Sequence, residues 1–211
     1  TVTTTIPVGD LPDSVAISPD GTRAYVTIEN AGTVSVISTA TNTITANIPV
    51  GDFAGGIALT PNGARAYVAA AHNPATSGDV VVIDTATNTV TATIPVDGHP
   101  HSVAVSPNGA RAYVTNWNLD GSVWVINTAT NTVIKTVEVG DLPSGVAVNP
   151  NSSRVYVTNA APIGTVSVIN ATTNTVAETI PVGNSPIGVA VSPNGARLYI
   201  TNRGYPGPGS L

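Results

Sequence analysis

Five copies of one segment, 42 to 46 residues apart, make up nearly the whole chain and restrict what it can fold into. Each copy opens with a run rich in Thr and Val, and the copies begin at Thr1, Thr43, Thr89, Thr132 and Thr175. Five of the six arginines recur at one position of the repeat, namely Arg23, Arg65, Arg111, Arg154 and Arg197. A period in the forties made of short β-rich runs is typical of β-propeller blades rather than of helical solenoids.

Each copy is predicted to contain four strands. In the third copy they are the extended run Thr89–Val96, the apolar segment Ser102–Ser106, the alternating segment Arg111–Thr115 and the apolar segment Ser122–Ile126. Pro, Asn and Gly supply the dihedral angles needed by the tight turns between them, and no run has a helical period longer than one turn. The sequence therefore predicts an all-β fold, a single β-propeller of four-stranded antiparallel blades over residues 1–202 with a Gly/Pro-rich tail. The expected boundaries are 1–42, 43–88, 89–131, 132–174 and 175–202 for the repeats and 203–211 for the tail.

The fifth unit lacks one strand. Segments of the Thr-Val-Ser-Val-Ile type end the other four units, at Thr33–Ile37, Asp79–Ile83, Ser122–Ile126 and Thr165–Ile169. After Asn202 the chain has two prolines and three glycines, which cannot supply a strand ladder. The outer strand expected at Thr1–Val8 is then left without a neighbour, and unpaired sheet edges favour association. We expect an incomplete last blade, in a piece of a longer propeller of about six to eight blades or in a chain that self-associates through that blade.

The motif Tyr-Val-Thr-Asn occurs at Tyr113–Asn116 and again at Tyr156–Asn159. With the flanking Val-Ala-Val-Ser-Pro-Asn-Gly segments, it resembles the YVTN family of β-propeller repeats over residues 1–202. Three further copies depart from the motif at one or two positions, at Tyr25–Ile28, Tyr67–Ala70 and Tyr199–Asn202. Similar repeats occur in secreted and surface proteins of bacteria and archaea, many without an assigned activity, and in some propeller enzymes. The resemblance thus implies a fold and an exported location, and it says little about a catalytic activity.

Residues shared by all units are expected to serve the architecture. Arg23 and its equivalents are predicted to pack and form hydrogen bonds between neighbouring blades. Asn42 and its equivalents are predicted to adopt the left-handed conformation in turns or to cap these turns through their side chains. Function is expected where the units differ, in the loops that enter the second strand and leave the third, which open on one face of a propeller. The candidate ligand-binding residues in these loops, the longest of which is predicted at Ala69–Gly78, are Phe53, His72, His99, His101, Trp117 and Asp120. Trp117 and Phe53 could be contact anchors for a protein or glycan, or could equally cover the top of the blades.

Two sets of side chains could hold a metal ion. His99 and His101 lie two residues apart in an extended segment, so their side chains point the same way and could join His72 as ligands. Near-equivalent carboxylates in Gly-Asp turns could hold Ca²⁺ at a propeller mouth, namely Asp10, Asp52 and Asp141. We favour the alternatives, which are exposed loop histidines and independent turns in which each aspartate bonds its own backbone. No cofactor is therefore expected.

Composition narrows the function classes. Charged residues are 9% of the chain, with 7 basic and 12 acidic ones, which argues against a nucleic-acid partner. No window approaches a membrane span of ~18 apolar residues, and nucleophile elbows, zinc-protease motifs and phosphate-binding loops are absent from the sequence. The leading hypothesis is a non-enzymatic extracellular or cell-surface module that binds a protein or polysaccharide through loops on one face. The alternatives are a lactonase- or lyase-type propeller enzyme with a central metal, and a structural repeat of a larger surface-layer or cell-wall protein.

Overall fold

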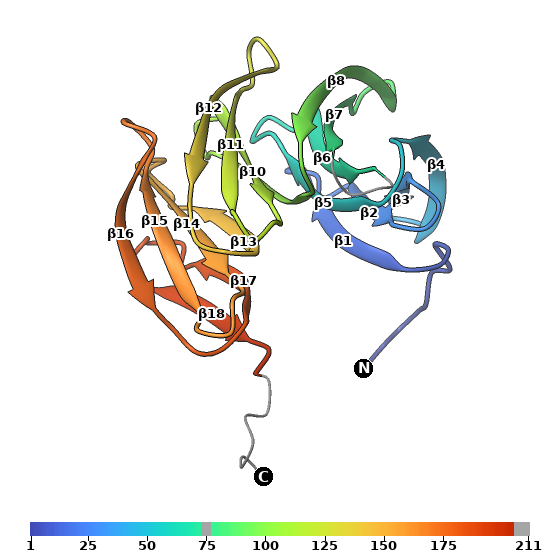
Figure 1. Cartoon of the computed structure of the whole chain (residues 1–211). Coiled ribbons are helices and arrows are strands. Elements are labelled where there is room, and N and C mark those ends of the chain that lie inside the picture. The colour runs from blue at the N-terminus through green and yellow to red at the C-terminus, as the bar shows by residue number, and fades with distance from the viewer. Residues whose placement is uncertain (73–76, 205–211) are drawn as a thin grey trace. The chain divides into compact units, whose positions relative to one another are not determined.

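The computed structural model describes residues 1–72 and 77–204, and every regular element in these ranges is a β-strand. The strands form four antiparallel sheets of four strands and one sheet of two (Figure 1). This confirms the all-β prediction, the four-stranded blades and the incomplete last blade. Because the described residues form no helix, they include none that could cross a membrane. The chain divides into two compact units, Thr1–Val105 and Ser106–Leu211, so that a single propeller domain over residues 1–202 stays a prediction.

Unit 1 contains the first two blades and β9, the first strand of the third blade. The strand orders of the two blades are β1-β2-β3-β4 and β5-β6-β7-β8. The strands are β1 (Pro12–Ile17), β2 (Arg23–Ile28), β3 (Thr33–Ser38), β4 (Thr43–Pro49), β5 (Ala54–Leu59), β6 (Arg65–Ala71), β7 (Ser77–Asp84), β8 (Thr89–Asp97) and β9 (Pro100–Val105).

Unit 2 contains the other three strands of the third blade, the fourth blade in the order β13-β14-β15-β16, and the two-stranded sheet of β17 and β18. The strands are β10 (Arg111–Asn116), β11 (Ser122–Asn127), β12 (Thr132–Glu138), β13 (Pro143–Val148), β14 (Arg154–Asn159), β15 (Thr165–Asn170), β16 (Thr175–Pro181), β17 (Pro186–Val191) and β18 (Leu198–Asn202). Every strand of the Thr-Val-Ser-Val-Ile type lies where the sequence predicts it.

The middle strands of a blade are buried on both faces. Tyr113, Val114 and Thr115 of β10 are almost completely shielded from solvent, although their side chains alternate between the two faces. In unit 1, Tyr25 of the first blade belongs to the same apolar cluster as Ile83 of the second. Burial of both faces follows because blades pack face to face, so an inner sheet becomes a layer between two others.

The repeated turns have the geometry expected from their residues. The asparagines of the turns between units have φ values from 52° to 56°, at Asn42, Asn88, Asn131 and Asn174. In the Ser-Pro-Asp-Gly turn, Asp20 Oδ1 accepts hydrogen bonds from Ser18 Oγ at 2.6 Å and from the Thr22 backbone N–H at 3.0 Å. These bonds, that of Ser18 first, lower the pKa of Asp20 to about 2. These positions therefore serve the turns, as predicted.

Two predicted boundaries are wrong. Residues Thr1–Val8 form no strand, because the outer strands pair with the third strand of their own blade and the described residues offer this segment no such strand. The predicted loop Ala69–Gly78 is mostly strand, since β6 and β7 continue to pair as far as Ala71 and Gly78. Residues 73–76 and most of the predicted tail, 205–211, lie outside the described residues.

Candidate functional site

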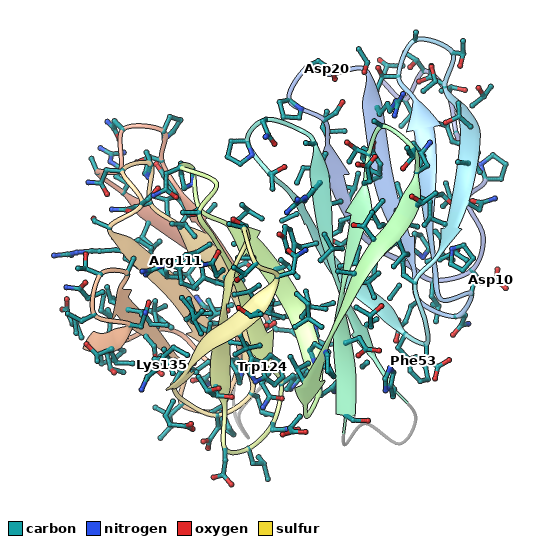
Figure 2. All side chains as sticks on the ribbon, turned by 90° about the horizontal axis from the view of Figure 1, so that it is seen from above. Asp10, Asp20, Phe53, Arg111, Trp124 and Lys135 are labelled. Atoms are coloured by element: carbon teal, nitrogen blue, oxygen red, sulfur yellow. The ribbon has the colours of Figure 1, made fainter. Side chains whose placement is uncertain are left out.

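Unit 1 has a pocket of about 430 Å³ between the β2–β3 loop and the β4–β5 loop. It is lined by Glu29, Asn30, Ala31, Gly32, Gly51, Asp52 and Phe53. Figure 2 shows Phe53 at one end of the strands of unit 1, with the Asp20 turn at the opposite end. Two residues predicted from the sequence, Asp52 and Phe53, thus lie in one pocket, at the loop ends rather than at the repeated turns.

The two loops around this pocket are held by their backbones. The Val50 N–H donates to Gly32 O at 2.9 Å, and the Glu29 N–H donates to Leu11 O at 3.0 Å. A Cβ atom at Gly32 would lie 1.8 Å from Gly51 O, so only glycine allows the loops to approach this closely. The walls of the pocket are therefore preorganised by main-chain contacts, and its side chains are available for a ligand.

Phe53 is placed in the pocket by an unusual backbone conformation. Its φ is +27°, a region that residues with a Cβ seldom occupy, and its side chain is 38% exposed. The Phe53 carbonyl accepts a hydrogen bond from the Ala71 N–H at 3.3 Å, which ties the start of β5 to the end of β6. The same loop position also has a positive φ at Leu11, Leu142 and Ser185, so the conformation belongs to the repeat, and the aromatic ring is what distinguishes this loop.

His99 is electrostatically coupled to this pocket. Burial lowers the pKa of the half-buried His99, and the negative charge of Glu29 opposes that change. Glu29 lines the pocket, so the charge that acts on His99 belongs to the pocket wall. Sequence reasoning selected His99 but did not select Glu29 or Asn30, because a loop acid and a loop amide carry no local signal that they face a pocket.

Acidification from pH 7 to pH 5 is expected to destabilise the fold in part through His99. Its pKa in the folded protein lies below the value of 6.5 for an unburied histidine, so the unfolded chain takes up the proton more readily. The stability contributed by neutral His99 is present above the unfolded pKa and is lost as the pH falls through the folded pKa. A His99→Gln variant should lose less of its melting temperature over this interval, measured by circular dichroism. An equal loss in both proteins would contradict the assignment.

His72 is held by its own hairpin. Its Nε2 lies 2.9 Å from Asp79 Oδ2, and its Nδ1 lies 3.4 Å from Ser77 Oγ. The side chain of His72 is 36% exposed and that of Asp79 is 20% exposed. The longer β6–β7 pairing brings this pair together, which the prediction of a loop at this place could not show. His101 lies half-buried in β9.

The other predicted residues lie in unit 2, except Asp10, which is exposed before β1 in unit 1. Trp117 is half-buried and Asp120 is exposed in the β10–β11 loop. The Leu142 N–H donates to Asn118 O at 2.9 Å, so the loop that carries Asp141 lies against the β10–β11 loop. Within residues 1–72 and 77–204, no three His, Asp or Glu side chains gather closely enough to hold a metal ion. We therefore base the candidate site on the unit 1 pocket.

Solved structures similar to this chain share its fold. Hydrazine synthase of Kuenenia stuttgartiensis matches with a TM-score of 0.84 at 20% identity, over 95% of this chain and 58% of that chain. A functionally unknown protein of Desulfotomaculum acetoxidans DSM 771 matches with a TM-score of 0.80 at 18% identity, over 92% of this chain and 64% of that chain. A β-propeller domain from Myceliophteria thermophila matches with a TM-score of 0.75 at 9% identity, again over 92% and 64%.

These likenesses show a β-propeller fold and, at such low identity, nothing about activity. The chain spans less than two thirds of the length of each of these structures. No family model matches the sequence, so the resemblance to YVTN repeats stays a prediction. No curated protein matches it either.

Proposed function

We propose that the protein is a non-enzymatic binding module that recognises a polysaccharide or a protein through the unit 1 pocket, outside the cell or at the cell surface. The observation that carries the proposal is the pocket of about 430 Å³ that joins an aromatic ring, an amide and two carboxylates. These groups belong to Phe53, Asn30, Glu29 and Asp52. A few polar groups beside an apolar surface in a preformed hollow are typical of ligand sites. The exported location rests on the resemblance to YVTN repeats.

A polysaccharide would use both kinds of group in this pocket. The C–H face of a sugar ring can pack on the apolar face of Phe53, as other flat apolar surfaces do. Sugar hydroxyls can donate hydrogen bonds to the carboxylates of Glu29 and Asp52, and bonds to a charged acceptor are shorter and stronger than neutral ones. The pocket would hold one or two sugar units, while the rest of the polymer lies across the neighbouring loops.

A protein partner would be recognised through a basic side chain. A lysine or arginine entering the pocket would be attracted by Glu29 and Asp52, and it could lie over the ring of Phe53. The salt dependence of binding distinguishes the two ligand classes. Charge attraction is screened over about 10 Å at 0.1 M salt, so binding of a basic peptide should weaken as salt is added, whereas stacking of a neutral sugar should not. Arrays of neutral polysaccharides and of basic peptides, probed with the labelled protein at low and high salt, would identify the class.

Phe53→Ala is expected to weaken binding of the ligand found on such arrays by about 2 kcal/mol, as for a central aromatic contact. The melting temperature should change little, since the ring is partly exposed and its backbone conformation is strained. Leu142→Ala is the matched control, because Leu142 occupies the equivalent loop position in unit 2 with a φ of 52°. Calorimetric titration and thermal melting give both quantities. A large fall in melting temperature with unchanged binding would show that Phe53 is structural and that the pocket is not the site.

A further inference from the structure

Neighbouring blades within each unit are joined by a directional hydrogen bond. In unit 1, Arg23 Nη1 donates to Thr85 O in the next blade at 2.7 Å. In unit 2, Arg111 Nη1 donates to Ala171 O in the next blade. Thr85 and Ala171 occupy the same position of the repeat. In both pairs of blades, one blade supplies the arginine donor and the last turn of its neighbour supplies the acceptor.

A second hydrogen bond repeats the same direction. The threonine of the Tyr-Val-Thr-Asn motif donates through Oγ1 to a first-strand carbonyl of the next blade. Thr115 donates to Ser144 O at 3.0 Å, and Thr158 donates to Ile187 O at 2.9 Å. Both threonines are fully buried by this contact. The threonine bonds and the arginine bonds run in the same direction, from the donor side of one blade to the acceptor side of the next.

The last blade has an exposed donor side, which we call the tail face and define as Arg197, directly before β18, with Tyr199 and Thr201 of β18. Tyr199 is 56% exposed, whereas Tyr25 and Tyr113 at the same repeat position are 1% exposed. Thr201 Oγ1 accepts from the Gly188 N–H at 3.0 Å, as Thr158 does from Gly145, but Thr201 is exposed to solvent. The tail face thus carries the side chains that donate between blades elsewhere in the repeat, and no further strand among the described residues pairs with β18 beyond β17.

The first blade has an exposed acceptor side, which we call the head face and define as Asp13, Val15, Ile17 and Thr39. Val15 is 62% exposed and Ile17 is 55% exposed. The residues equivalent to Val15 in the next three repeats are between 6% and 9% exposed, namely Ile57, Val103 and Val146. Asp13 and Thr39 occupy the positions whose carbonyls accept the threonine and arginine bonds in other blades. The head face is therefore an acceptor surface of the same design.

We propose that the tail face of one molecule binds the head face of a second copy of this chain, as one more contact between blades. Arg197 would donate to Thr39 O, Thr201 would donate to Asp13 O, and Tyr199 would pack beside Val15. The only charges among these residues, on Arg197 and Asp13, are opposite. Because the two faces differ, the contact is head to tail and builds chains or rings instead of two-fold dimers. A second copy is the occupant because one chain carries both complementary faces.

Sedimentation velocity on the 211-residue chain and two variants tests this proposal. The unsubstituted chain should form species larger than a monomer, in an amount that rises with concentration. Val15→Glu should block the head face and Tyr199→Glu the tail face, and each variant alone should remain monomeric. An equimolar mixture of the two should form a dimer, since each mixed pair retains one intact head face and one intact tail face.

Ile134→Glu is the matched control, because Ile134 is a 45% exposed apolar residue of β12 outside both faces, and its substitution should leave association unchanged. Circular dichroism verifies that each variant is folded, and Arg197→Asp is a second tail-face variant should Tyr199→Glu unfold the short sheet. A monomeric unsubstituted chain at every concentration would overturn the proposal. So would failure of the mixture to associate, or loss of association in Ile134→Glu.

Discussion

Replacing Tyr67 by Ala is expected to lower the free energy of unfolding by about 3–5 kcal/mol, as for other large buried aromatic residues. The side chain of Tyr67 is 0% exposed in the middle strand β6, where neighbouring strands cover it on all sides. Burial raises the pKa of the Tyr67 hydroxyl, and the Arg65 side chain beside it opposes that rise. The substitution would remove the ring and also the partner of a repeated arginine. Urea unfolding followed by circular dichroism measures the change.

Tyr199→Ala is the matched control for this prediction. Tyr199 stands at the same repeat position in β18 and likewise follows an arginine by two residues, but it is 56% exposed. Its replacement should change the free energy of unfolding by about 0.5 kcal/mol or less, as for most surface substitutions. The comparison should be made at a concentration at which the protein is monomeric. Equal costs at the two positions would mean that neighbouring blades do not contribute to the stability of this tyrosine.

Replacing Gly121 by Ala is expected to cost about 1–3 kcal/mol through overpacking. A Cβ atom at this position would lie 2.1 Å from Gly140 O and 2.5 Å from Pro143 Cδ. The loop cannot simply retreat, because the Val139 N–H donates to Gly121 O at 2.9 Å. Glycine is therefore required here for a close approach of two backbones. A fall in the urea midpoint without a change in slope is the expected measurement.

Asp120→Ala provides the control for Gly121→Ala in the same loop. Asp120 is exposed, and shortening its side chain removes no buried contact. Its unfolding midpoint should remain within the error of the unsubstituted protein. If Gly121→Ala proved as harmless as Asp120→Ala, the two loops would have to separate at little cost, and the rigid arrangement inferred for the equivalent loops around the unit 1 pocket would lose its support.

Part of the candidate site could be predicted from the sequence. Phe53 and Asp52 can be selected from the sequence because they stand in a loop whose residues differ between repeats. Glu29 and Asn30 cannot be assigned to the same pocket from the sequence, because they join Phe53 only when two loops meet in the folded chain. The position of His72 differs from the prediction. The sequence predicts a long loop here, but extra pairing of β6 with β7 places His72 beside Asp79. That pairing depends on contacts along the whole hairpin.

The sequence by itself determined the strands, the turns and the number of repeats. Alternation of side chains, turn residues and a regular period are local properties, so they can be read without knowledge of neighbours. Only the tertiary structure decided which copies of a repeated residue are buried. Tyr25 and Tyr199 occupy the same position of an Arg-x-Tyr-x-Thr segment, yet one is 1% and the other 56% exposed, because a neighbouring blade covers the first and not the second. Burial depends on residues far away in the chain, and the same dependence decides which loop side chains meet in a pocket.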